Sequence, residues 1–208
     1  IPAPDHSVFW GAWYRRLVEQ RAALETISTN AADPSDPTAT HRLTSLDGVR
    51  IGARLIEPPG DTPVRAGLIS VHGASVHKTL EQTAQRWRAI AESGVSVLLI
   101  RVRGFPGSQL DTGDLSAGGS GVGWITRGLD TQPGLLDGSM DWVLSGAVAD
   151  VANACRAMRN RLAGEDESNP RSIRDKLPLL LHGESLGGAL AIIATAQLSG
   201  RLRQERVI

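Results

Sequence analysis

Apolar and polar positions alternate along the chain in two different ways. Short and almost continuous apolar runs predict buried strands, and longer stretches with apolar residues every three or four positions predict helices. The predicted strands are 66–73, 95–104 and 176–183. The predicted helices are 79–94, 141–164 and 186–198. Because buried strands separated by helices require a parallel sheet covered on both faces, the fold class is α/β.

The beginning of the chain has a different pattern. Helical spacing predicts a helix over Val8–Ser28, and a Pro-rich polar linker follows to residue 38. Two further strands, "HRLTSL" and "VRIGARLIEP", are joined by Asp47-Gly48, which is typical of a tight hairpin. We expect this hairpin at the edge of the parallel sheet. The predicted organisation is a helix and linker over 1–38, then the N-terminal portion of one α/β domain over 39–208, with Arg206–Ile208 opening a further strand.

Composition excludes several classes of function. Lysine plus arginine and aspartate plus glutamate both number 22, so no net charge favours nucleic acid or an anionic membrane. We find no apolar run near the roughly 20 residues that span a bilayer and no signal peptide, so we expect a cytoplasmic protein. The single cysteine, Cys155, lies on an apolar helix stripe and is expected to be buried. No Cys/His cluster indicates a metal, and we expect no cofactor.

The candidate chemistry centres on Ser185. Gly183-Glu184-Ser185-Leu186-Gly187 has the pattern G-x-S-x-G between a predicted strand and a predicted helix. In a nucleophile elbow, a strained serine is raised above the sheet at such a turn, and the residues beside it must be small. Gly183 and Gly187 satisfy that requirement, whereas the alternative is an ordinary turn with an incidental serine. The first turn of the following helix also directs N–H groups towards a developing oxyanion.

A second loop supports this interpretation. The strand that ends at Val71 leads into His72-Gly73-Ala74. In α/β-hydrolases the loop at this place supplies one oxyanion N–H, and the residue after the nucleophile supplies the other. The predicted donors are therefore the backbone N–H groups of Ala74 and Leu186. The alternative is a plain glycine turn after a strand.

Two histidines and one glycine-rich stretch offer competing sites. His72 is interpreted as a turn-stabilising residue bonded to backbone, and His182 as a strand residue directed along or into the sheet. Neither is expected to be the general base, because this fold places that histidine after the nucleophile. "GGSGVG" at 118–123 lacks the strand–helix setting of a nucleotide loop, so an active-site loop is the preferred interpretation.

Several segments make the chain similar to the acetyl xylan esterase / cephalosporin C deacetylase family of α/β-hydrolases. These are "RVRGFPGS" at 101–108, "GWITRGLD" at 123–130, and the long helix leading to "GESLGG". The resemblance implies that Ser185 is the nucleophile and that Ala74 and Leu186 are the oxyanion donors. It also suggests a homo-oligomer, which the residues themselves do not decide.

The sequence departs from that family at Phe105 and Leu186, where the family usually has glutamine, and at Ala74, where it tends to have an aromatic residue. Backbone donors survive such changes. The acyl pocket is altered, which leaves room for an acyl group larger than or different from acetyl.

A serine of this kind needs a histidine and a carboxylate. Only 23 residues follow Ser185, and none of them is His or Asp. We therefore expect a C-terminal segment or a second polypeptide to supply both groups and complete the domain. The predicted function is a serine hydrolase acting on small carboxylic esters through an acyl-enzyme. An acyltransferase or amidase of the same fold, and a non-catalytic binding protein, remain as alternatives.

Overall fold

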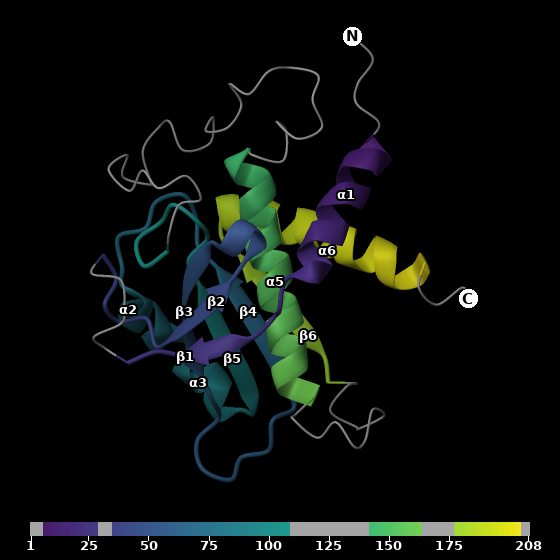
Figure 1. Ribbon diagram of the computed structural model, residues 1–208. Helices are drawn as coiled ribbons and strands as arrows, with labels where there is room; N and C mark the ends of the chain where they lie inside the picture. The colour runs from purple at the N-terminus through teal and green to yellow at the C-terminus, as the bar shows by residue number, and fades with distance from the viewer. Residues whose placement is uncertain (1–5, 29–34, 109–141, 164–176, 205–208) are drawn as a thin grey trace.

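A computed structural model describes residues 6–28, 35–108, 142–163 and 177–204 (Figure 1). The described strands form one sheet in the order β1-β2-β3-β5-β4-β6. The strands are β1 Leu24–Thr26, β2 His41–Thr44, β3 Arg50–Ile56, β4 Ala66–Val71, β5 Val95–Ile100 and β6 Leu179–Gly183. The pairs β4–β5 and β4–β6 are parallel, while β1, β2 and β3 are joined antiparallel at one edge. The expected α/β fold with an antiparallel hairpin towards one edge is confirmed.

Helices cover both faces of this sheet (Figure 1). They are α1 His6–Glu19, α2 Leu80–Ala84, α3 Arg88–Glu92, α5 Val143–Ala163 and α6 Leu186–Gln204. One apolar cluster joins α1, α5 and α6 to alternate residues of β4 and β5 such as Ile69 and Leu98. A second cluster joins α2 and α3 to the intervening residues, such as Leu68 and Val97. Since successive strand residues point to opposite faces, the two clusters are the two sides of the sheet.

The strands predicted over 66–73, 95–104 and 176–183 and the helices predicted over 79–94, 141–164 and 186–198 are confirmed, with one interruption. In the helix predicted over 79–94, α2 and α3 are separated by a 3-10 turn, Gln85–Trp87. Thr79 and Gln82 form a capping box at its start, and Gly94, with a φ of 95°, ends it. Cys155 is buried on α5 as expected, and burial raises the pKa of its thiol to about 12.

The helix predicted over Val8–Ser28 is wrong in its second half. Helix α1 ends at Glu19, and Leu24–Thr26 pairs with β2 instead. Side chains of α5 satisfy the carbonyls at this break: Arg156 Nη1 donates to Leu17 O at 2.6 Å, and Asn160 Nδ2 donates to Ala22 O at 2.9 Å. Pairing with β2 also covers an otherwise open strand edge, so tertiary contacts outweigh the helical pattern here.

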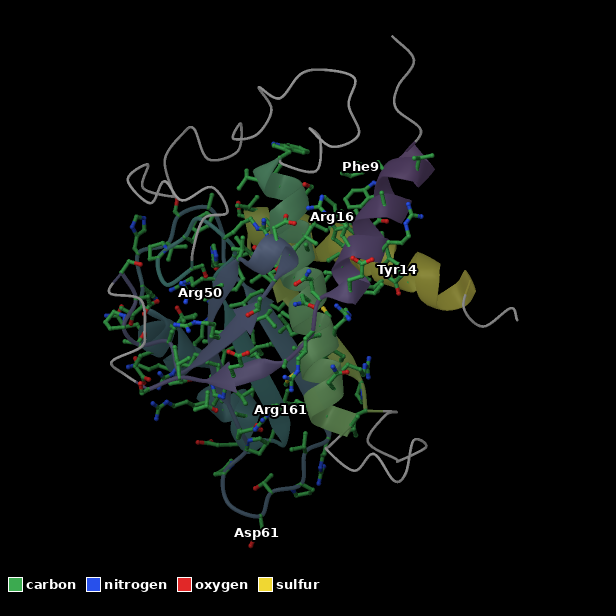
Figure 2. All side chains as sticks on the ribbon, in the orientation of Figure 1. Phe9, Tyr14, Arg16, Arg50, Asp61 and Arg161 are labelled. Carbon is green, nitrogen blue, oxygen red and sulfur yellow. The ribbon has the colours of Figure 1, made fainter. Side chains whose placement is uncertain are left out.

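Aromatic residues fix α1 against the core. The Trp13 indole is fully buried and donates to the Ser145 carbonyl on α5 at 3.0 Å. Trp10 contacts Trp13 edge to face, with ring centroids 5.3 Å apart. Figure 2 shows Phe9 and Tyr14 on the same helix, and Arg161 on α5, where it forms an ion pair with Glu57 of the segment after β3.

The tight turn between β2 and β3 has the left-handed backbone that Asp-Gly favours. Asp47 has a φ of 62° and Gly48 a φ of 74°. The hairpin prediction is confirmed. The stretches 118–123 and 123–130, and the strand expected at Arg206–Ile208, lie outside the described residues.

A buried ion pair holds the loop after β5 to α5. Arg103 and Asp150 are 1% and 0% exposed. Arg103 Nη2 donates to Asp150 Oδ1 at 2.9 Å, and the Arg103 backbone N–H donates to Oδ2 at 2.8 Å. Gly146 leaves room for the guanidinium, because a Cβ there would lie 2.3 Å from Arg103 Nη1. Arg103 Nε also donates to both carboxylate oxygens at 3.2 Å, so the two charged groups satisfy each other away from water.

Removing one member of this pair should therefore be costly. Asp150→Ala removes the buried carboxylate that accepts from both the guanidinium and the backbone N–H of Arg103, and we expect the free energy of unfolding to fall by about 3–5 kcal/mol. Arg88→Gln, which breaks an exposed ion pair with Glu81, is the matched control and should cost under about 1 kcal/mol. Urea denaturation of both variants measures the difference, and equal losses would contradict this account.

Candidate active site at the turn between β6 and α6

Ser185 occupies a strained turn between β6 and α6. Its φ is 50°, in the left-handed region that non-glycine residues seldom adopt, and its side chain is exposed. The Glu184 N–H donates to Val71 O at 3.1 Å, so pairing with β4 extends to the residue before the serine. The turn begins at the end of a parallel strand and leads directly into α6. This is the sharp strand–helix turn that G-x-S-x-G predicts.

Gly183 and Gly187 permit this turn because their neighbours leave no space for a side chain. A Cβ on Gly183 would lie 2.2 Å from Gly187 O. A Cβ on Gly187 would lie 2.5 Å from both Val71 O and His72 O. The first turn of α6 is thus pressed against the end of β4. The expectation that both residues must be small is confirmed.

The loop after β4 lies directly beside the serine. A Cβ on Gly73 would lie 3.4 Å from Ser185 Cβ and 3.3 Å from Glu184 O. The next residue, Ala74, is exposed, and Leu186 is the first residue of α6. Neither backbone N–H donates to any residue that the structure describes. Among the described residues, both predicted oxyanion donors are therefore free to bind another acceptor.

His72 ties this loop to the loop after β5. Its Nδ1 donates to Gly73 O at 2.7 Å, and its Nε2 accepts from the Val102 N–H at 3.2 Å. These bonds fix the neutral ring with the proton on Nδ1. Burial lowers its pKa to about 4, assisted by the positive charge of Arg101 and opposed by the bond to Gly73. The interpretation of His72 as a turn-stabilising residue is confirmed.

His182 is engaged on the α2–α3 side of the sheet. Its Nδ1 shares a hydrogen bond of 3.2 Å with Ser70 Oγ, and its ring meets Trp87 edge to face at 5.0 Å. Within the described ranges, no side chain forms a hydrogen bond with Ser185 Oγ. The same ranges contain no group of three or more His, Cys, Asp or Glu residues able to hold a metal. Among the described residues, the Ser185 hydroxyl thus has no histidine or carboxylate hydrogen-bonded to it.

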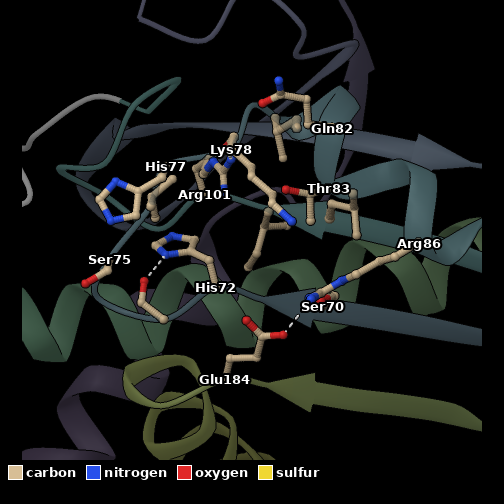
Figure 3. Close-up of a pocket in the computed structure, with 15 residues that line it drawn as sticks. Ser70, His72, Ser75, His77, Lys78, Gln82, Thr83, Arg86, Arg101 and Glu184 are labelled. Carbon is tan, nitrogen blue, oxygen red and sulfur yellow. Dashed lines mark hydrogen bonds and ion pairs between the residues drawn. The ribbon is translucent and has the colours of Figure 1, made fainter.

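A cavity of about 250 Å³ opens beside the serine (Figure 3). Gly73 and Glu184 line it and both adjoin Ser185, which is not itself a lining residue. Glu184 forms an ion pair with Arg86 across the cavity at 2.7 Å. Ser70, Leu99 and Arg101 form part of the side towards the sheet. The cavity therefore lies on the α2–α3 side of the sheet.

The sequence patterns did not predict the buried polar contact behind this cavity, which joins Asp36 to Arg101 and Leu80. Asp36 is 1% exposed; its Oδ2 accepts from the Leu80 N–H at 2.9 Å and lies 3.5 Å from Arg101 Nη2. Arg101 also donates to Lys78 O. This aspartate lies in a segment that composition marked as a linker. Through these contacts Asp36 connects its own segment to the start of α2 and to the end of β5.

The family model described as acetyl xylan esterase (AXE1) matches residues 3–206 of this chain. The chain belongs to the acetyl xylan esterase family.

Two solved structures of similar fold agree with that membership. Acetyl xylan esterase 1 from Thermoanaerobacterium sp. JW/SL YS485 is 24% identical, with a TM-score of 0.58. Acetyl xylan esterase from Paenibacillus sp. R4 is 18% identical, with a TM-score of 0.55. In each case the alignment covers 94% of this chain and 56% of the other. No curated protein matches the chain.

The chain thus shares its fold with the acetyl xylan esterases and spans about 56% of the length of these two. Among the described helices, none is both long and apolar enough to cross a bilayer.

The close approach of α6 to β4 makes a prediction that distinguishes two adjacent glycines. Gly187→Ala forces backbone atoms apart, and we expect a loss of about 1–3 kcal/mol in the free energy of unfolding. At Gly188 a Cβ would lie 3.3 Å from Gly183 O, a contact that a small shift relieves. Gly188→Ala should therefore cost much less, as thermal unfolding can measure. A smaller loss for Gly187→Ala than for Gly188→Ala would show that the contact is not restrictive.

The neutral state of His72 predicts how stability depends on pH. Its folded pKa of about 4 lies below the ordinary value of 6.5, so the folded state favours the uncharged ring. This contribution to stability is complete above pH 6.5 and is lost as the pH falls through 4. Between pH 7 and pH 4 the free energy of unfolding should therefore fall less in His72→Gln than in the wild-type protein. NMR titration of the His72 ring gives a check that needs no variant, and a pKa of 6.5 or above would overturn the assignment.

Proposed function

We propose that the chain carries the nucleophilic half of a carboxylic ester hydrolase, with Ser185 as the nucleophile. The observation that supports this most directly is the strained backbone of Ser185, held against β4 at the start of α6. Strain of this kind concentrates at functional sites, where the surrounding structure maintains it. Membership of the acetyl xylan esterase family favours ester hydrolysis over the other reactions of this fold.

In this proposal the Ser185 hydroxyl attacks the carbonyl carbon of an ester while a base removes its proton. The electron pair of the C=O bond moves to oxygen, and the N–H groups of Ala74 and Leu186 stabilise that oxyanion. Collapse of the tetrahedral intermediate expels the protonated alcohol and leaves an acyl-serine. Water, deprotonated by the same base, then releases the carboxylic acid and restores Ser185.

The base and its orienting carboxylate are proposed to come from outside the described residues. His72 uses both ring nitrogens on backbone groups, and His182 is held by Ser70 and Trp87. His77 also lines the cavity, and within the described residues it forms no hydrogen bond with Ser185. Glu184 is paired with Arg86. A C-terminal segment or a second polypeptide would supply a histidine and a carboxylate, as the order of this fold requires.

His72 is proposed as a positioning residue, since it touches no reacting atom. By joining Gly73 to Val102 it fixes the loop that presents the Ala74 N–H. Donors held in advance need no reorganisation when charge develops on the substrate, which is the main source of oxyanion stabilisation. The ring remains neutral at physiological pH because its pKa is about 4.

Replacement of the serine tests the proposal. In the full-length protein, Ser185→Ala should abolish labelling by a fluorophosphonate probe and lower kcat on 4-nitrophenyl acetate by about 10⁴–10⁶-fold, because the covalent step is lost. Ser93→Ala, at an exposed serine that ends α3, is the matched control and should retain both activities.

Wild-type protein that neither reacts with the probe nor hydrolyses the ester would favour a binding protein of the same fold. Labelling that persists in Ser185→Ala would assign the nucleophile to another residue. Transfer of the acyl group to an added alcohol or amine faster than to water would favour an acyltransferase.

A further inference from the structure

The cavity beside Ser185 has a lining rich in cationic and hydrogen-bond-donating groups. Lysine and arginine supply three of its side chains, Lys78, Arg86 and Arg101, while Glu184 is the acidic one; His77 also lines it. His72 adds no charge at physiological pH, because its pKa is about 4. Gln82 and Thr83 add further polar groups from α2. An oxyanion site alone does not require this surplus of positive charge.

The three basic residues differ in whether an acidic side chain balances their charge. Arg86 is paired with Glu184 at 2.7 Å. Arg101 shares the buried Asp36 carboxylate at 3.5 Å, and that carboxylate also accepts from Leu80 N–H and the Thr38 hydroxyl. Among the residues that the structure describes, the Lys78 ammonium has no acidic partner. Figure 3 shows its side chain extending into the middle of the cavity, between His72 and Thr83.

Arg101 provides a second, independent sign of a missing acceptor. Its side chain is 3% exposed, and its Nε has no hydrogen-bond partner among the described residues. A buried N–H without an acceptor costs free energy, and native structures contain few of them. Arg101 lines the cavity, and because its Nε is almost completely covered, a ligand oxygen can accept this bond only after a shift of the side chain.

The choice of residue at position 78 is also unusual for this chain. The sequence contains two lysines, Lys78 and Lys176, against twenty arginines. An ammonium on a flexible stem acts as a compact point charge with three donors, whereas arginine favours fixed two-pronged pairing. A lysine therefore suits an anionic group that enters and leaves with each turnover.

We propose that this cavity binds a carboxylate carried by the ester substrate, with the Lys78 ammonium as its main charge partner and the Arg101 guanidinium adding positive charge from the cavity wall. This rests on the proposed function and specifies its substrate class. The cavity, about 250 Å³, is below the roughly 300–1,000 Å³ of sites for drug-sized ligands, so it suits a short carboxylate-bearing arm. The arm belongs either to the acyl group or to the alcohol.

Paired esters that differ only in charge test the proposal in the full-length protein. On the acyl side, the 4-nitrophenyl monoester of adipic acid is compared with its terminal amide. On the alcohol side, 4-acetoxyphenylacetate is compared with 4-acetoxyphenylacetamide. In one of these pairs kcat/KM should be about five- to tenfold higher for the carboxylate, and the pair that responds identifies the part of the ester in the cavity.

Substitution of the lysine should change this preference. Lys78→Gln should bring the carboxylate-to-amide ratio of kcat/KM close to one, and Lys78→Arg should restore most of it because the charge returns. Arg15→Gln removes an exposed positive charge from α1, on the other face of the sheet, and controls for net charge. The ratio should be unchanged in that control. A wild-type ratio near one in both pairs, or a preference that survives Lys78→Gln, would overturn the proposal.

A binding measurement separates this proposal from the assignment of Ser185. NMR titration of Ser185→Ala protein with 4-hydroxyphenylacetate and adipate monoamide, and with the uncharged amide of each, needs no catalysis. Tighter binding of at least one of the acids, lost in a Ser185→Ala, Lys78→Gln double variant, supports the carboxylate site even if no ester is hydrolysed. If the wild-type protein hydrolyses 4-nitrophenyl acetate normally but Ser185→Ala protein binds the acids and the amides equally, the carboxylate site is rejected and the assignment of Ser185 stands.

Discussion

The contact between the first turn of α6 and the end of β4 determines most of the site. Gly187 lies so close to the carbonyls of Val71 and His72 that no side chain fits between them. This contact sets how far α6 stands above the sheet, and with it the position of Ser185 beside Gly73. The parallel pairing of β4 with β6 brings the two segments to the same sheet edge. A larger residue at position 187 would separate the serine from the loop after β4.

A network of buried polar groups supports that contact from behind. His72 joins the loop after β4 to the loop after β5, and Arg103 joins the latter loop to α5 through Asp150. Arg101 and Asp36 connect the same region to α2. Loops carry few apolar contacts of their own, so these hydrogen bonds supply the rigidity that strands and helices obtain from packing.

The sequence predicts those features that depend on local pattern. Apolar runs located β4, β5 and β6, Asp47-Gly48 located the hairpin, and Gly183 and Gly187 marked the tight turn around Ser185. It did not predict β1, because Leu24–Thr26 continues the helical spacing of α1 and only the edge of β2 makes it a strand. Nor did it predict the pairing of Asp36 with Arg101, since residues so far apart along the chain leave no local pattern. Local sequence patterns therefore predict the turn around Ser185, but they do not predict the long-range polar contacts that hold the surrounding loops.

The order of strands has a consequence for how the chain folds. β4 lies between β5 and β6, yet more than a hundred residues separate β4 from β6, as the bond between Ser70 and His182 illustrates. During synthesis one edge of β4 stays uncovered until β6 emerges, so the apolar core between them is exposed for longest at the place where the site forms. Closing such long loops slows folding and favours association of unfinished chains. Shielding that edge of β4 until β6 and the turn that carries Ser185 emerge therefore favours productive folding.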